Sequence, residues 1–174
     1  MTIWWYLTRS TGIVATVLAV GSIVWGTRFS ARATGTRLGP NWWLDLHNWL
    51  GGLALAFTVA HVVFSVIDSD SGLRVIDALI PGQAKDSTTA VSVGVVALYA
   101  LVLVVVTSWP RKRFGRRVWR AIHLLSLPAI VLVGVHTFQM GSDAPSTTLR
   151  VVTVGLVAVM LYPLGLRLFG LRRS

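Results

Sequence analysis

The sequence predicts an all-α integral membrane protein of five transmembrane helices, and three observations support this fold class. Hydrophobic residues make up 54% of the 174 residues, charged residues make up only 13%, and the mean hydropathy is +0.70. A soluble domain typically carries about twice that share of charge. The apolar residues gather in runs of about 20 residues or slightly more, which is the length that crosses the hydrocarbon core as a helix. The basic residues fall mostly in short segments between these runs, where they act as topology signals.

The five apolar runs lie at about residues 5–27, 43–67, 89–109, 118–140 and 147–169. The first is longer than the apolar part of a signal peptide, the second contains a single charged residue, the third contains none, and the fourth contains a proline. Helix is the only structure that pairs the backbone of such runs inside lipid, and none of them alternates as a barrel strand does. We therefore interpret residues 1–174 as one transmembrane domain, with no room for a soluble catalytic domain.

The distribution of basic residues predicts the orientation in the membrane. Twelve of the sixteen lysines and arginines fall in the segments after the first and third runs and at the carboxy-terminal end. The remaining four are Arg9, Arg74, Lys85 and Arg150. Because basic residues are retained on the cytoplasmic side, the amino terminus is predicted outside and the carboxy terminus in the cytoplasm. The formal charge of +10 is explained in this way, so no nucleic-acid partner is expected, and membrane lipid surrounds the helices.

The predicted outer loop between the second and third runs is the longest loop of the chain. Apolar residues recur within it, at Leu73, Val75, Ile76, Leu79 and Ile80. This pattern is typical of a short amphipathic helix at the membrane surface. Such a helix could cap a cofactor held in the bundle.

All four histidines of the chain lie in the second and fourth runs. They are His47 and His61 in the second run, and His123 and His136 in the fourth. Ionisable side chains are costly inside a membrane and normally face the bundle interior, where they find a functional partner. The two runs are separated by one span and therefore run parallel, so the first histidines share one depth and the second histidines share another. The spacing separates the two depths by about 20 Å.

This pattern predicts two sites, with His47 and His123 at the inner level and His61 and His136 at the outer level. Two imidazoles on opposite sides suit a six-coordinate haem iron, whereas a four-coordinate zinc ion needs two more ligands at each level. The absence of cysteine excludes covalent haem attachment, so a b-type haem is expected at each site. A straight helix would not place both histidines of the fourth run on one face. Thirteen residues separate His123 from His136, and at 3.6 residues per turn the two side chains point in very different directions. Pro128 lies between them and is expected to kink the helix.

The histidine spacings also resemble those of the ferric reductase-like transmembrane domain family. That family includes the membrane part of NADPH oxidases and the haem subunit of a bacterial methionine sulfoxide reductase system. The segments LHNWLGGLALAFTVAHVVFSVID and RVWRAIHLLSLPAIVLVGVHTF carry the paired histidines, and the opening WWYLTRSTG is similar to bacterial members. The resemblance implies a multi-pass protein of the bacterial cytoplasmic membrane. It also implies that the four histidines are axial ligands of two stacked haems.

By the same resemblance the protein is the haem-carrying membrane component of an oxidoreductase. The chain lacks the flavin and nucleotide domain of NADPH oxidases, so a separate flavoprotein or a membrane quinol is the expected electron donor. A ferric complex, oxygen or a periplasmic enzyme is the expected acceptor. Haem propionates are anionic and are stabilised by arginines near each interface. The candidates are Arg116, Arg117 and Arg120 on the inner side, with Arg9 and Arg150 on the outer side.

Two other functions fit parts of the pattern. The four histidines could relay protons or bind a transition metal ion in a transporter, which would be colourless. A carrier usually shows broken helices or inverted halves, and five spans with two histidine helices fit that poorly. A purely structural assembly subunit has little use for four histidines at matched depths.

Overall fold

The computed structural model describes residues 2–30, 39–108, 115–140 and 147–168, and these ranges contain helices and no strands. The apolar runs correspond to the long helices α1 (Ile3–Ser30), α2 (Pro40–Ile67), α4 (Thr88–Ser108) and α7 (Thr147–Leu168), and to the pair α5 (Arg116–His123) and α6 (Ser126–Gln139). In the described part, four segments are long and apolar enough to cross a membrane: Ile3–Ser30, Asn41–Ile67, Thr88–Ser108 and Arg116–Gln139. The chain is therefore a multi-pass membrane protein, all-helical in its described part. A fifth span at α7 and the orientation of the bundle stay predictions.

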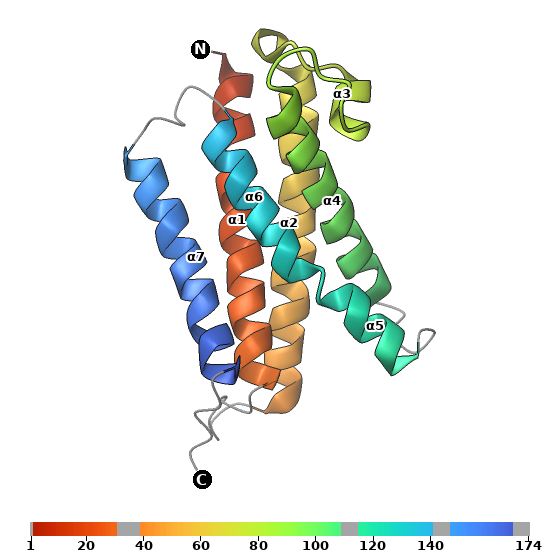
Figure 1. Ribbon diagram of the computed structural model, residues 1–174, viewed down its shortest axis with the longest axis vertical. Coiled ribbons are helices and arrows are strands. Elements are labelled where there is room, and N and C mark those ends of the chain that lie inside the picture. The colour runs from red at the N-terminus through yellow and green to blue at the C-terminus, as the bar shows by residue number, and fades with distance from the viewer. Residues whose placement is uncertain (1, 31–38, 109–114, 141–146, 169–174) are drawn as a thin grey trace.

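The helices form two packed pairs. α1 lies along α2, and α4 lies along α6, while α7 covers part of α1 (Figure 1). The two pairs meet where Val20 of α1 packs against Ile130 of α6, and Leu156 of α7 joins this cluster. Figure 1 shows the start of α1 near α3 (Val75–Leu79) at one end of the bundle, and α5 with the end of α7 at the other end.

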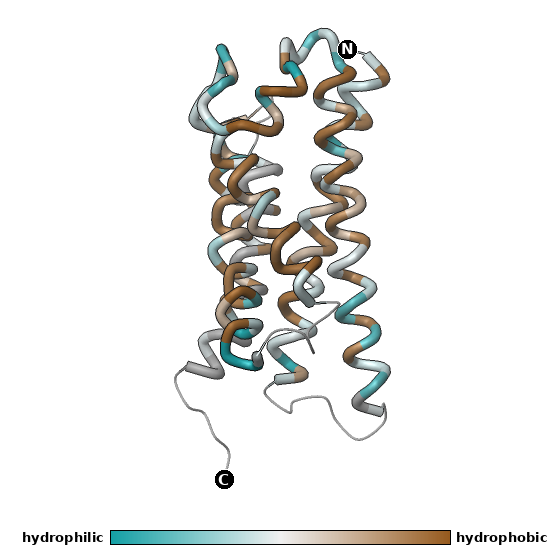
Figure 2. Tube along the Cα trace, turned by 90° about the vertical axis from the view of Figure 1, so that its right-hand side faces the viewer, coloured by the Kyte–Doolittle hydropathy of each residue, from teal (hydrophilic) through white to brown (hydrophobic). Residues whose placement is uncertain are grey.

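Apolar side chains cover the outside of the bundle as well as its inside. Figure 2 shows hydrophobic residues along most of the length of the helices. Val59 of α2, Val106 of α4 and Val151 of α7 are 48%, 56% and 65% exposed. In water this surface would drive aggregation, whereas lipid tails are as apolar as these side chains. The exposed surface therefore fits a bilayer environment.

The fourth predicted run is divided into two helices, a larger change than the kink expected from Pro128. Proline has no backbone N–H, so the carbonyl of Leu124 cannot receive the usual hydrogen bond from four residues later. That carbonyl accepts instead from the backbone N–H of Leu127 at 3.1 Å, and Leu125 donates to Ile122 at 3.0 Å. These three-residue bonds tighten the chain between α5 and α6 and change the direction in which the following side chains point.

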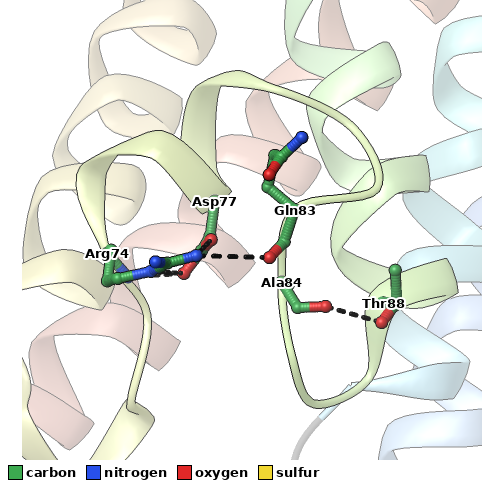
Figure 3. Close-up of polar contacts among 5 residues, drawn as sticks. All are labelled: Arg74, Asp77, Gln83, Ala84 and Thr88. Atoms are coloured by element: carbon green, nitrogen blue, oxygen red, sulfur yellow. Dashed lines mark hydrogen bonds and ion pairs between the residues drawn. The ribbon is translucent and has the colours of Figure 1, made fainter.

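The loop after α2 contains a 3₁₀ turn (Ser69–Ser71) and the short helix α3, which confirms a helix in this loop. Figure 3 shows Arg74 and Asp77 facing each other beside Gln83. Asp77 is buried and accepts hydrogen bonds from the backbone N–H of Arg74 at 2.9 Å and from its guanidinium at 2.7 Å. The guanidinium also donates to the carbonyl of Gln83 at 3.4 Å. The hydroxyl of Tyr99 donates to the carbonyl of Leu79 and so ties α3 to α4.

Replacing Asp77 with alanine is expected to loosen this loop at neutral pH. The guanidinium of Arg74 and its backbone N–H hold the pKa of Asp77 below its usual range. A lowered folded-state pKa means that the ion pair stabilises the loop at neutral pH and is lost as the pH falls below about 3.9. Amide hydrogen exchange of Val75–Leu79 should be faster in the variant at pH 7, and the difference from wild type should shrink in acid.

Asp70→Ala, in the neighbouring turn, is the matched control and should leave this exchange unchanged. Equal exchange in wild type and Asp77→Ala at pH 7 would show that other contacts hold the loop.

Candidate functional site

The four histidines face each other in two pairs across the space between the helix pairs. The ring centroids of His47 and His123 are 5.8 Å apart, and those of His61 and His136 are 6.3 Å apart. The rings of the two pairs are inclined by 63° and 87°. These are the same pairs that the sequence predicts from depth alone. The break between α5 and α6 resolves the phase difficulty, because it lets His123 and His136 point to the same side.

The separation of the rings matches a metal held between them. An imidazole nitrogen binds a transition metal at about 2.0–2.1 Å and the ring centroid lies about 1.1 Å behind it, so opposed ligands place their centroids about 6.3 Å apart. Both observed separations are close to this value. Among the described residues no group of three or more histidine, cysteine, aspartate or glutamate side chains could hold a metal ion. Each level therefore presents two opposed imidazoles as candidate ligands within the described residues.

A hydrogen bond at Nδ1 fixes the orientation of each ring. His61 lies 2.8 Å from the carbonyl oxygen of Thr8, and His47 lies 2.9 Å from that of Ser22. His136 lies 2.8 Å from the carbonyl oxygen of Ala90. A carbonyl can only accept, so Nδ1 carries the proton in these three rings. The deprotonated Nε2 is then the atom available to bind a metal.

His123 is held by a different kind of acceptor. Its Nδ1 lies 3.2 Å from the hydroxyl oxygen of Ser108. The indole of Trp119 stacks on the same ring, with 4.9 Å between centroids and 23° between the planes. His123 therefore has a longer hydrogen bond than the other three rings and an aromatic neighbour.

Three glycines make room for the histidines that bond to carbonyls. Each follows the accepting residue by four positions: Gly12 after Thr8, Gly26 after Ser22, and Gly94 after Ala90. A Cβ atom on Gly94 would lie 2.8 Å from Nδ1 of His136. The same atom on Gly12 or Gly26 would lie 3.0 Å from the ring of His61 or His47. These glycines therefore let each ring reach the carbonyl on the neighbouring helix.

Sequence reasoning missed these glycines, although a signal for them was present. Gly12 and Gly26 are fourteen residues apart, which equals the spacing of the histidines that they contact, His47 and His61. Gly51 and Gly52, which attract attention because they lie close to His47 in sequence, do not touch a histidine ring. Both line the cavity described next.

One cavity of about 2470 Å³ runs between the helix pairs and is lined by all four histidines. Pockets for ordinary small ligands measure about 300–1,000 Å³, so this space is large enough for more than one such group. Small side chains line its middle depth, among them Ala19, Gly52 and Ala97. The wall has no large side chain at these places, so space connects the two histidine levels.

Polar groups line both ends of the cavity. Arg116 and Arg120 lie at the level of His123, and Arg9 lies at the level of His61, where its guanidinium rests 4.1 Å above the ring of Trp5. Arg117 is exposed and is absent from the cavity wall, and the side chain of Arg150 lies outside the described residues.

Two buried polar atoms of the cavity wall have no hydrogen-bond partner in the described part of the chain. They are the hydroxyl of Thr8 near the outer pair and the indole Nε1 of Trp119 near the inner pair. Buried polar groups are nearly always hydrogen-bonded, so these two atoms are available to bond to a group held in the cavity. Together with the arginines, they make each end of the cavity suitable for an anionic group.

The comparison with known families agrees with this geometry. The model of the ferric reductase like transmembrane component matches residues 11–134, which is more than two-thirds of the chain. The match spans His47, His61 and His123 and ends shortly before His136. No curated protein and no solved structure matches the chain. The chain therefore belongs to the family of ferric reductase-like transmembrane components.

Proposed function

We propose that this protein carries electrons across the membrane through two b-type haems, each bound by one histidine pair. The observation that supports this most directly is the arrangement of the four imidazoles. They form two opposed pairs at two depths of one cavity, and each pair is spaced so that both imidazoles could bind one metal ion between them. In the proposed assignment His47 and His123 hold the inner haem, and His61 and His136 hold the outer haem.

The residues of the chain suit a cofactor that keeps the same ligands when it gains or loses an electron. A haem iron with two histidine ligands has no open position and supplies one-electron transfer. The hydrogen bonds at Nδ1 hold the rings rigid, so little rearrangement accompanies a change of charge. Spacing along α2 separates the two histidine levels by about 20 Å along the bundle axis, and the cavity between them is continuous.

The ends of the cavity suit the propionates of the two cofactors. Arg116, Arg120 and the indole N–H of Trp119 would bind the inner propionates, and Arg9 with the hydroxyl of Thr8 would bind the outer ones. Charge-assisted hydrogen bonds from arginine to carboxylate are among the stronger polar contacts in proteins. Arg117 and Arg150 stay candidates only through their position in the sequence.

The proposed role places the chain in an oxidoreductase of the bacterial cytoplasmic membrane. A cytoplasmic flavoprotein or a membrane quinol would supply electrons at the inner haem, near α5. A ferric complex, oxygen or a periplasmic enzyme would receive them at the outer haem, beneath α3. Flavin or quinone would thus act only through a partner.

An absorption spectrum of the detergent-purified protein tests this proposal. We expect two haems per chain in a pyridine haemochrome assay, and a low-spin spectrum in the oxidised and dithionite-reduced states. Absence of haem after haem-replete expression would overturn the proposal. The histidines would then be assigned to proton or metal-ion transport.

A further inference from the structure

The two helix pairs share a pattern in which a backbone carbonyl and a glycine four residues later face a histidine of the neighbouring helix. One of the four histidines departs from this pattern. In the first pair, α1 presents a carbonyl and, four residues later, a glycine to each histidine of α2. In the second pair, α4 does the same for His136 with Ala90 and Gly94. Fourteen residues beyond Ala90 and Gly94 stand Val104 and Ser108. This is the spacing that separates Gly12 from Gly26 on α1.

Ser108 therefore occupies the position that is glycine at the other three histidines. Its hydroxyl donates to the carbonyl of Val104 at 2.6 Å, so it takes the acceptor that the pattern provides for His123. A hydroxyl has one hydrogen, so the same oxygen must accept from Nδ1 of His123 at 3.2 Å. Ser108 is thus inserted between the ring and the carbonyl as a relay.

We propose that Ser108 is a positioning residue that gives the inner haem a higher reduction potential than a direct carbonyl contact would give it. This inference rests on the proposed function and deepens it. A hydrogen bond from Nδ1 raises the basicity of a ligating imidazole, and a more basic ligand favours the oxidised metal. The bond to Ser108 is longer than the bonds to carbonyls, which measure 2.8–2.9 Å. His123 therefore has the longest of these four hydrogen bonds at Nδ1, and in the proposed assignment it is the ligand that this bond polarises least.

This difference favours entry of an electron at the inner haem and makes the onward step to the outer haem less favourable than a direct carbonyl contact would make it. Arg116 and Arg120 lie at the same end of the cavity as Ser108, against the single Arg9 at the outer end, so the larger number of cationic groups and the long hydrogen bond act on one site. Both effects favour the reduced state there. The inner haem is thus the site that a modest donor can reduce.

Redox titration of the purified haem-loaded protein tests the proposal with two variants at one position. Ser108→Gly restores the glycine pattern, so Nδ1 of His123 can donate directly to the carbonyl of Val104. At a fixed potential, the reduced-to-oxidised ratio of the inner haem should fall by about tenfold, which is about 59 mV for a one-electron couple. Ser108→Ala removes the acceptor but keeps the Cβ atom in the way, so the ratio should rise.

Opposite shifts distinguish the relay from simple packing, because a structural defect would move both variants in the same direction. Val106→Ala is the control, since this side chain lies two residues from Ser108 on α4, is 56% exposed and does not line the cavity. It should leave both potentials unchanged. Shifts of one sign, or no shift with both haems bound, would overturn the role of Ser108. Absence of haem from the wild-type protein would instead overturn the proposed function.

Discussion

His136→Ala is expected to lose the outer haem and keep the inner one. In the proposed assignment the ring of His136 is one of two protein ligands at the outer level, and alanine leaves only His61 of that pair facing the cavity. The rings of the inner pair contact different residues, Ser22 and Ser108, and lie at the other histidine level of the bundle. The haem content should therefore fall from two to one per chain, with the remaining haem low-spin. A pyridine haemochrome assay and a reduced-minus-oxidised spectrum measure both quantities.

The reciprocal variant, His123→Ala, is the control for this prediction. It should lose the inner haem and keep the outer one, so the two variants should retain haems of different potential. Free imidazole added to His136→Ala should restore part of the missing absorption, because it can occupy the vacated ligand position. Equal loss of both haems in each variant would argue against two separate sites.

The positions of the spans could be predicted from the sequence because a helix needs about 20 apolar residues to cross the hydrocarbon core of a membrane. The predicted run at 43–67 becomes α2 (Pro40–Ile67), and that at 89–109 becomes α4 (Thr88–Ser108). The pairing of histidines was also accessible, since parallel helices place equal positions at equal depth. His47 and His123, which are far apart in sequence, lie together for this reason.

The detail of the fourth run could not be read in the same way. Pro128 predicts a disturbance, but the way the freed carbonyl of Leu124 finds a new donor depends on local geometry. The backbone carbonyls that accept hydrogen bonds from the histidine rings could not be predicted from the sequence, for a different reason. Every residue has a carbonyl, so no residue type marks Thr8 or Ala90 as partners of a histidine. Only the glycine four positions after the carbonyl marks the contact in the sequence. That glycine can be interpreted only when the histidine that faces it is already known.

Gly94→Ala is expected to disturb the outer site although it removes no ligand. The added Cβ would lie 2.8 Å from Nδ1 and 2.9 Å from Cε1 of His136, closer than carbon atoms normally approach. The ring must move away from α4 and lose its hydrogen bond to the carbonyl of Ala90. Loss of such a partner typically weakens metal binding by about 10–100-fold. Outer haem occupancy should fall accordingly, and overpacking should lower the stability of the protein by about 1–3 kcal/mol.

Gly134→Ala makes the same chemical change two residues from His136 and provides the matched control. Its Cβ would meet no atom within 4 Å in the described part of the chain, and Gly134 does not line the cavity. Because alanine is favoured over glycine inside a helix by about 0.5–1 kcal/mol, this variant should be as stable as wild type or more so. The unfolding temperature of Gly134→Ala should therefore be unchanged or higher and its haem content should stay at two per chain, whereas both should fall in Gly94→Ala. If both variants bind two haems with unchanged spectra, the close contact between Gly94 and His136 does not control the outer site.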